Sequence, residues 1–252
     1  MEEMNQDLTV AIPTINSGRY LDIVLEFYRE HGVPVTVFVD DRSVDDTLAI
    51  ARRLAPRVFS VRNPTLFIAE GLVEEISRRC ESSWMLRIDD DELPTVAMLE
   101  FVQRATAGNG MKVYAFSRHQ CTVSQRGKLL ASRAVSPLAH QQWRLYRPAE
   151  MRFVQGLHTS GLIWDGEHQA ITAPEEAAMI HLDWILHSYD ERRQKVERYD
   201  AHSPNEGTRW RSYYLYEEDP SSRANLTELN LPEFGKTCLE ISRRFQDLCL
   251  GV

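Results

Sequence analysis

Four consecutive acidic residues form the strongest chemical signal in the sequence. Asp89, Asp90, Asp91 and Glu92 directly follow a mostly apolar run at 84–88. Adjacent carboxylates repel one another, and at the end of a buried strand this repulsion requires a cation or hydrogen bonds to offset it. Carboxylate oxygens suit Mg²⁺ or Mn²⁺, with substrate phosphates completing the shell. Because side chains alternate along extended backbone, we expect Asp89 and Asp91 on the same side.

The same acidic run has a second interpretation, as a solvated turn ahead of a helix that begins near Pro94. For an isolated acidic run this interpretation is favoured. After a buried strand of an α/β protein, a ligand site is favoured instead, because such sheets bind ligands beyond their strand ends. A calcium loop of the EF-hand type is excluded, since its loop glycine and terminal glutamate are missing.

A second acidic pair, Asp40 and Asp41, follows the apolar run at 35–39. A carboxylate in this position can accept a hydrogen bond from a nucleobase N–H or a ribose hydroxyl. Residues slightly further on are expected to cap the next helix, where the helix dipole favours acidic groups: Ser43, Asp45 and Asp46.

A third polar turn, Pro13-Thr14-Ile15, closes the first apolar run at 8–12. A strand that ends in a tight polar turn exposes backbone groups to a planar ring. Taken alone, this turn is a weak signal for nucleotide binding.

The elements that position these residues alternate along the first ninety residues. Strands are expected at 8–12, 35–39, 58–61 and 84–88, and helices at 21–32, 48–54 and around 72–76. Such alternation predicts an α/β fold, a Rossmann-like and mostly parallel sheet with helices on both faces. All three polar segments then lie at carboxyl ends of strands, where ligands of such sheets bind.

The alternation weakens after Leu93, which predicts a smaller α+β part on the acceptor side. We expect a strand at 113–116, a loop or hairpin at 124–137, short strands at 143–146 and 162–164, a charged helix at 184–202 and two further helices. The predicted layout is a single domain, 1–252. Its nucleotide-binding half is 8–100 and its acceptor-side half, with C-terminal helices, is 101–252.

Composition bounds the class of protein. The 252 residues are 43% hydrophobic and 26% charged, with a formal net charge of -8, which disfavours a general nucleic-acid binder. The four cysteines are widely spaced without a CxxC pair, which predicts reduced thiols in a cytoplasmic protein. The acidic N-terminus does not resemble a signal peptide, and no apolar run reaches the roughly 20 residues of a membrane helix. We therefore expect any membrane contact to be peripheral.

Three segments, AIPTIN, VFVDDRSVDDT and WMLRIDDDE, resemble in order and spacing the nucleotide-binding half of family 2 glycosyltransferases of the GT-A fold. The resemblance covers about residues 8–100. It implies inverting transfer from a nucleotide-activated sugar, most often a UDP-sugar, assisted by Mn²⁺ or Mg²⁺. It also implies roles for the individual residues. The base would be lined by Pro13, Thr14 and Ile15 and hydrogen-bonded by Asp41, with support from Asp40. Asp89 would approach the ribose or the metal, Asp90 would lie on the nucleotide side, and Asp91 would bind the metal.

The C-terminal half resembles the family less closely. WRLYR followed by FVQGLH resembles a segment of bacterial members that add sugars to lipopolysaccharide cores, although Thr159 stands where Glu commonly follows the histidine. MIHLDW resembles a later histidine segment and makes His181 the candidate for a further metal or diphosphate contact. A hydrogen-bonded core histidine is the alternative. Three basic residues are candidates for the diphosphate or for a solvated helix face: Arg192, Arg193 and Lys195.

The general base of an inverting transfer has no clear candidate. Many family members place an Asp after a Glu for this role, and no such pair occurs in the matching region. Asp165 and Glu167 are preferred, because they occupy a Trp-Asp-Gly-Glu turn after an expected strand. The other candidates are His158, Glu175, Glu176 and Asp183.

Other classes of protein fit less well. A nucleotidyltransferase normally begins with a glycine-rich phosphate loop, a dinucleotide oxidoreductase needs GxGxxG, and a P-loop NTPase needs GxxxxGK[ST]; the first strand leads to none of these. A sugar-nucleotide-binding protein without catalysis stays open, because the base is unclear. The expected partner is a nucleotide-sugar donor, and the acceptor can be a glycan, a lipid-linked molecule or a natural product.

Overall fold

The structure, a computed structural model, describes residues 7–65, 69–108, 110–137, 141–156, 159–218 and 225–250. The chain divides into two compact units. The first unit comprises residues 1–116 and 141–178, and the second comprises 117–140 and 179–252. Within the described ranges, no helix has both the length and the apolar character needed to cross a bilayer.

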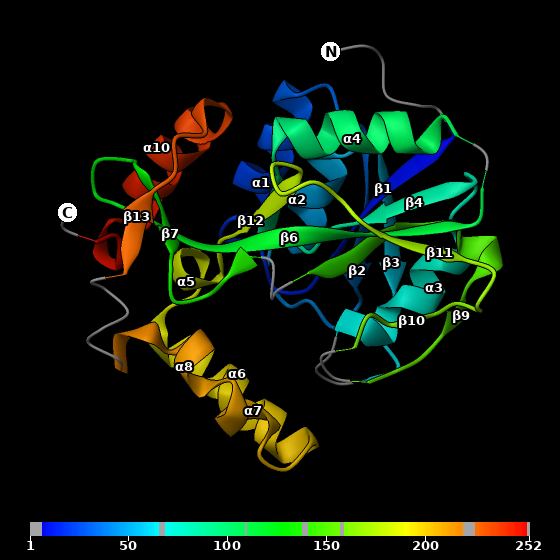
Figure 1. The fold of residues 1–252 in the computed structure, drawn as a ribbon. Coiled ribbons are helices and arrows are strands. Elements are labelled where there is room, and N and C mark those ends of the chain that lie inside the picture. The colour runs from blue at the N-terminus through cyan, green and yellow to red at the C-terminus, as the bar shows by residue number, and fades with distance from the viewer. Residues whose placement is uncertain are drawn as a thin grey trace. The chain divides into compact units, whose positions relative to one another are not determined.

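The first unit is built on a mostly parallel sheet (Figure 1). Four parallel strands lie in the order β3-β2-β1-β4: β3 (Arg57–Val61), β2 (Val35–Asp40), β1 (Leu8–Thr14) and β4 (Trp84–Arg87). The sheet continues with β8 (Gln142–Tyr146) antiparallel to β4, β6 (Lys112–Val123) antiparallel to β8, and β11 (Gln169–Thr172) parallel to β6. The predicted α/β class is confirmed, as are the four early strands.

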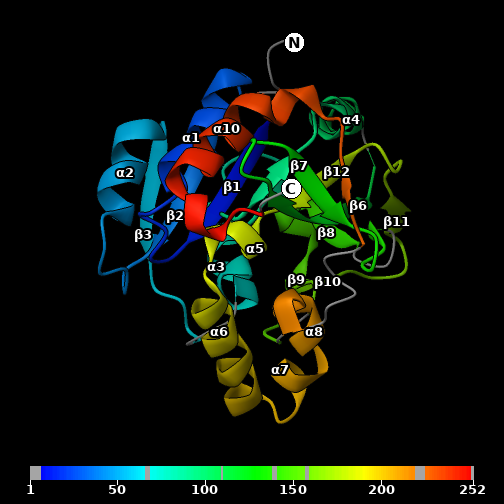
Figure 2. The ribbon, with the colours of Figure 1, turned by 90° about the vertical axis from the view of Figure 1, so that its left-hand side faces the viewer.

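Helices cover both faces of this sheet. The crossovers β1-α1-β2 and β2-α2-β3 run in the same direction, so α1 (Leu21–Glu30) and α2 (Thr47–Leu54) share one face and pack together (Figure 2). The β3-to-β4 crossover runs the opposite way and places α3 (Val73–Arg78), which follows the 3₁₀ turn Ala69–Leu72, on the other face. The remaining elements of the unit are β5 (Glu92–Pro94), α4 (Val96–Thr106), the 3₁₀ turn Pro148–Glu150, and the β9–β10 pair (Arg152–Phe153, Leu162–Ile163).

The core under α3 shows why these segments form strands. Ala11, Phe38 and Met85 come from β1, β2 and β4 and pack with Val73 and Ile76 of α3. The strand residues on either side of them point to the opposite face, because side chains alternate along a strand. Burial of each large apolar side chain contributes about 1.5–3 kcal/mol, so both faces hold the strands in place. The strand ends are therefore fixed in position.

The second unit combines a small antiparallel sheet with helices. Residues 121–123 of β6 pair with β7 (Leu129–Ser132), which pairs with β13 (Leu226–Glu228). The segment 124–137, predicted to be a loop or hairpin, therefore contains the turn and the second strand of a hairpin. The helix predicted at 184–202 is two helices, because Ser188 caps the second of them with Glu191. The other elements are β12 (Ala178–His181), α5 (Asp183–Leu186), α6 (Tyr189–His202), α7 (Glu206–Arg209), α8 (Arg211–Tyr214), α10 (Gly235–Arg244) and 3₁₀ turns at Tyr216–Glu218, Pro232–Phe234 and Gln246–Leu248.

Candidate functional site

The carboxyl ends of β1 and β4 are joined by hydrogen bonds. Thr14, the last residue of β1, donates its hydroxyl to Asp90 Oδ2 at 2.6 Å. Ser17, in the turn after β1, donates its hydroxyl to the same oxygen. Both donors are buried, so Asp90 is a fixed acceptor that holds the turn after β1 against the acidic run. The predicted nucleotide-side residues Thr14 and Asp90 are thus brought together.

The turn after β1 is also joined to the loop after β2. Asn16 has a φ of 53°, a left-handed conformation that asparagine tolerates, and its side-chain oxygen accepts from Val44 N at 2.9 Å. Asn16 N donates to Ser43 Oγ at 3.3 Å, and Gly18 N donates to Asp45 Oδ2 at 2.8 Å. A Cβ on Gly18 would lie 2.9 Å from that carboxylate oxygen, so any larger residue here would force the Asp45 side chain to shift. Three strand-end segments therefore form one framework.

The helix-capping roles predicted for this loop are corrected by the structure. α2 begins at Thr47, its N-cap is Asp46, and no side chain caps it through a hydrogen bond. Ser43 and Asp45 bond to the turn after β1 instead, and Asp45 also accepts from Thr47 N at 3.1 Å. Burial raises the pKa of Asp45, but the hydrogen bonds from Thr47 and Gly18 outweigh it and the pKa is lowered. The sequence pattern S-x-D-D is typical of a helix cap, but Ser43 and Asp45 form hydrogen bonds to the turn after β1 instead.

Asp40 and Asp41, at the end of β2, have different surroundings. Asp40 is buried and accepts from Arg42 Nε at 2.8 Å and from Arg42 N at 3.0 Å. Burial raises its pKa, but the hydrogen bonds from Arg42 outweigh this and lower it. Asp41 is 32% exposed and pairs with exposed Arg62 at 2.6 Å. Of the two, Asp41 presents its carboxylate to the surface, whereas Asp40 fixes the loop through Arg42.

Two buried arginines compensate the outer carboxylates of the acidic run. Arg144, on β8, donates to Asp89 Oδ2 at 2.7 Å and to both oxygens of Glu92 at 2.8 Å. Arg87, the last residue of β4, donates to Asp89 Oδ1 at 3.1 Å. The side chains of Arg144 and Glu92 are 1% and 0% exposed. The repulsion expected at Asp89 and Glu92 is therefore relieved from within the protein by salt bridges.

Neither arginine was singled out from the sequence. The available signal was an arginine inside each of two apolar strand segments, MLRI and WRLY, since an unpaired charge would not be buried there. Two groups near these charges, Glu70 and Tyr28, have raised pKa values. Burial raises the pKa of Glu70, although attraction to Arg87 opposes this, and burial raises the pKa of Tyr28, with repulsion from Glu92 adding to it.

The remaining residues predicted for the donor are placed at the same edge. Asp91 is 7% exposed and follows Asp90 in the turn after β4. Pro13 is buried in β1, whereas Ile15 is 43% exposed. Of the three residues predicted to line a base, Ile15 is the one that presents an apolar side chain at the surface.

The two preferred base candidates lie at the opposite edge of the sheet. Gln169 of β11 is in register with Lys112, the first residue of β6, and β6 runs parallel to β4 because both are antiparallel to β8. Asp165 and Glu167 precede Gln169, so they lie beyond the amino ends of these strands. The structure therefore does not bring Asp165 or Glu167 together with the strand-end acids.

Asp165 makes local contacts at that edge. Its Oδ1 accepts from His168 Nδ1 at 2.7 Å and from Glu167 N at 3.1 Å. The hydrogen bond from His168 is the main cause that lowers the pKa of Asp165, whose side chain is 57% exposed. Among the other base candidates, Glu175 and Glu176 are exposed, and His158 lies outside the described residues.

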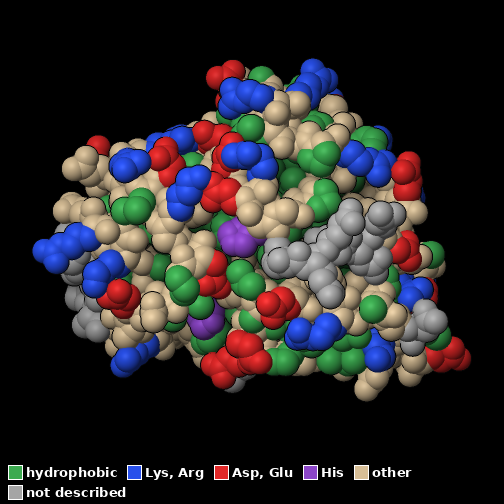
Figure 3. Space-filling view, turned by 90° about the horizontal axis from the view of Figure 1, so that it is seen from above, with side chains coloured by type: hydrophobic (Ala, Val, Ile, Leu, Met, Phe, Trp, Pro, Cys, Tyr) green, Lys and Arg blue, Asp and Glu red, His purple; other side chains and the backbone are tan. Residues whose placement is uncertain are grey.

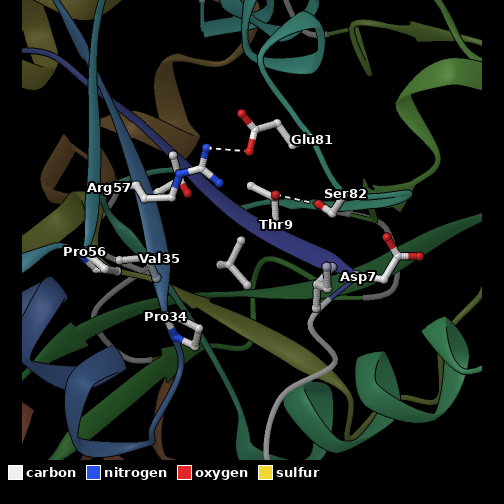
Figure 4. A pocket seen from close by; sticks show the side chains of 11 residues that line it. Asp7, Thr9, Pro34, Val35, Pro56, Arg57, Glu81 and Ser82 are labelled. Carbon is white, nitrogen blue, oxygen red and sulfur yellow. Dashed lines mark hydrogen bonds and ion pairs between the residues drawn. The ribbon is translucent and has the colours of Figure 1, made fainter.

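A pocket of about 340 Å³ lies at the same amino edge (Figure 4). It is bordered by an ion pair between Arg57 and Glu81 at 2.9 Å and by a hydroxyl pair, Thr9 and Ser82, at 2.5 Å. None of the residues predicted for the site lines it. On the face drawn in Figure 3, basic and acidic side chains are interspersed, so surface charge alone does not locate a site there.

His181, in the second unit, is a buried and hydrogen-bonded residue. Arg118 Nη2 donates to Tyr213 Oη at 2.9 Å, and Tyr213 Oη donates to Gln120 Oε1 at 2.6 Å. Gln120 Oε1 also accepts from His181 Nδ1. Because an amide oxygen can only accept, Nδ1 is the donor of this hydrogen bond. This agrees with the core-histidine alternative and is also how metal-binding histidines are oriented.

The basic residues of α6 divide into three types. Arg192 is buried, donates to Tyr214 O at 2.6 Å and pairs with Glu217, so it has a structural role. Arg193 is exposed and pairs with Glu197 at 2.6 Å on a solvated helix face. Lys195 donates to Asp183 Oδ1 at 2.9 Å.

Comparison with protein families decides the class of the protein. The model of glycosyl transferase family 2 matches residues 9–164, which include β1, β2, β4 and the acids at their ends. The chain belongs to glycosyl transferase family 2. It is thereby a glycosyltransferase that uses a nucleotide-sugar donor. No curated protein matches the chain.

Solved structures resemble this glycosyltransferase only distantly. S. aureus TarS 1–349 is 14% identical and covers 86% of this chain and 73% of its own, with a TM-score of 0.43. The complex of the same TarS fragment with UDP-GlcNAc is 14% identical and covers 86% of this chain and 74% of its own, with a TM-score of 0.41. HddC from Yersinia pseudotuberculosis is 11% identical and covers 76% of this chain and 99% of its own, with a TM-score of 0.45. The chain spans 44% of the longer TarS chain. At this level of similarity, the ligands and activities of these proteins are not assigned to this chain.

Proposed function

We propose that this family 2 glycosyltransferase transfers a sugar from a UDP-sugar to an acceptor hydroxyl with inversion, assisted by Mn²⁺ or Mg²⁺. The observation that supports this most is the framework at the carboxyl edge of the first unit. There Thr14 bonds to Asp90, and Asp41, Asp89 and Asp91 follow strands that end at the same edge. Ligands of such sheets bind outside the carboxyl ends.

The nucleoside would be held by the segments after β1, β2 and β4. We propose that Ile15 packs against the base, with Pro13 and Thr14 shaping the turn behind it. Asp41 would accept the imide N–H of uracil, with Asp40 fixing its loop through Arg42. Asp90 would keep the turn in place as the acceptor of Thr14 and Ser17.

The proposed metal-binding residues can be weighed by the groups already around them. Both oxygens of Asp89 accept from guanidinium groups, at 3.1 Å from Arg87 and 2.7 Å from Arg144. A cation on Asp89 would be repelled by these arginines, so we assign Asp89 to a ribose hydroxyl and Asp91 to the metal. His181 is proposed as a further contact to the metal or the diphosphate. When bound, the cation offsets the charge that develops on the leaving diphosphate.

Transfer requires an acceptor hydroxyl that attacks the anomeric carbon opposite the leaving nucleotide. A general base that removes its proton contributes about 10²–10⁴-fold. Asp165 and Glu167 are the candidates that the sequence offers, but their place at the amino edge, opposite the strand-end acids, argues against this role. The acceptor would be a glycan, a lipid-linked molecule or a natural product. We also propose a cytoplasmic location, in keeping with the free cysteines Cys80, Cys121, Cys238 and Cys249.

Calorimetry with UDP, GDP and dTDP, each with and without Mn²⁺, tests this proposal. We expect UDP to bind and Mn²⁺ to increase its affinity. Binding of GDP or dTDP instead would change the base assignment. Absence of metal-dependent binding for all three nucleotides would overturn the metal-assisted mechanism.

A further inference from the structure

β11 is an outer strand of the first unit's sheet, and one side of it is open. It pairs with β6, and no other described strand pairs with it. It is the last strand on the side of the sheet opposite β3, where Figure 2 shows it at the margin of the molecule's first unit. Its side chains are exposed or half-buried. A further strand therefore has access to β11.

The register of β11 determines which of its backbone groups face this open side. Gln169 N donates to Met111 O at 2.9 Å, so Gln169 faces β6. In a parallel ladder, alternate residues direct both their N–H and their C=O to the same neighbouring strand. Ile171 therefore faces β6 as well, whereas the backbone groups of Ala170 and Thr172 point away from it. Both outward residues are exposed, and no described residue forms a hydrogen bond with their backbone groups.

The opposite outer strand, β3, is protected in the way that sheet edges usually are. Arg57 begins this strand and Arg62 follows it, with side chains that are 45% and 70% exposed. The guanidinium groups of Arg57 and Arg79 also lie 5.8 and 5.6 Å from the ring centre of Phe59. Charged side chains at an edge disfavour the addition of another strand. By contrast, β11 has the sequence Gln-Ala-Ile-Thr, without a charged residue or a proline.

A second copy of β11 fits this open side. In an antiparallel pair, residues that face the partner exchange both backbone hydrogen bonds, so Ala170 would pair with Thr172 of the second copy. Ile171 would then lie opposite Ile171 of the second copy. The side chains that meet are all uncharged, so no like charges oppose the pairing. Pro174, whose nitrogen carries no hydrogen, would end the ladder.

We propose that two copies of this glycosyltransferase associate through β11, which pairs antiparallel with itself across a two-fold axis. The same residues contribute from both copies, so the interface is isologous. The backbone hydrogen bonds of Ala170 and Thr172 and the contact between the Ile171 side chains form a small interface. We therefore expect a dimer that depends on protein concentration. This inference does not depend on the proposed donor or metal.

Sedimentation equilibrium of the full chain over a range of concentrations tests the pairing. Ile171→Lys and Ile171→Glu each place like charges opposite one another across the two-fold axis. Ala170→Pro removes an outward N–H and leaves the hydrogen bonds to β6 in place. Val58→Lys is the matched control, because Val58 is also a half-buried apolar residue of an outer strand. Circular dichroism melts establish that each variant is folded.

We expect wild type and Val58→Lys to dimerise equally. Ile171→Lys, Ile171→Glu and Ala170→Pro should associate at least about tenfold more weakly, because each change occurs twice in a symmetric interface. An equimolar mixture of Ile171→Lys and Ile171→Glu should recover the dimer, since opposite charges then face each other. If the Ile171 variants do not fold, Ala170→Pro decides the test.

Two results would overturn the proposal. Equal association of wild type and folded Ala170→Pro would show that the copies meet through another surface. A wild type that sediments as a monomer at every concentration would show that β11 does not pair with itself.

Discussion

The two edges of the first unit's sheet carry the same kinds of residue but hold them differently. At the carboxyl edge, Asp89 is held by Arg144, whose side chain is 1% exposed. At the amino edge, Arg57 and Glu81 form an ion pair whose side chains are 45% and 77% exposed. Exposed pairs contribute roughly 0–1 kcal/mol, whereas loss of one partner from a buried pair is strongly destabilising. Acidic and basic residues therefore mark a built site only where buried contacts fix them.

Replacing Arg144 by Met should have the largest effect of any substitution that tests this contrast. It leaves Asp89 and the fully buried Glu92 without their shared guanidinium, and we expect a loss of about 3–5 kcal/mol in the free energy of unfolding. Arg57→Met at the amino edge is the matched control and should cost about 1 kcal/mol or less. Urea unfolding measures both. Equal losses would show that the two edges do not differ as described.

Replacing Glu70 by Gln should sharpen the description of the carboxyl edge through its pH dependence. Burial raises the folded-state pKa of Glu70, although attraction to Arg87 opposes it. Its contribution to stability is therefore present below the unfolded pKa, near 4.5, and is lost as pH rises through the folded pKa. We expect Glu70→Gln to gain stability over wild type as pH rises from acid to neutral. A constant difference between their unfolding free energies at all pH values would contradict a raised pKa for Glu70 in the folded state.

Replacing Asp165 by Asn and Glu167 by Gln should have the smallest effect if the amino edge is not the reacting edge. We expect kcat to fall by less than about threefold in each variant, a change of roughly 0.7 kcal/mol. Loss of a general base would instead lower kcat by about 10²–10⁴-fold. Single-turnover transfer rates distinguish these results. A loss of the larger size would establish one of these carboxylates as the base and overturn the contrast between the edges.

Much of the first unit could be predicted from the sequence, because its strands are apolar runs closed by polar turns. The pattern predicted β1, β2, β3 and β4 within two residues at each end. The second unit was less readable, since its helices are short and one break depends on a single cap at Ser188. Caps compete with tertiary contacts, which is why Ser43 and Asp45 were assigned to a helix that they do not cap.

For the site, the sequence showed which carboxylates follow strands but not which partners they meet. Asp89 and Asp91 looked equivalent by alternation, and they differ because Arg144 arrives from β8, 55 residues further on. Similarly, the turn at Asp165 and Glu167 looked suitable as a site, yet its edge of the sheet is set by the pairing of β11 with β6. Register and long-range pairing are properties that local patterns do not contain.

The most direct test of the central claim, that the carboxyl edge binds the donor with Asp91 as metal ligand, is calorimetry of UDP with Asp91→Asn. Wild type and Asp165→Asn, a matched change at the amino edge, serve as controls. We predict that Mn²⁺ increases UDP affinity in both controls and no longer does so in folded Asp91→Asn. An unchanged, Mn²⁺-dependent affinity in Asp91→Asn would contradict the claim.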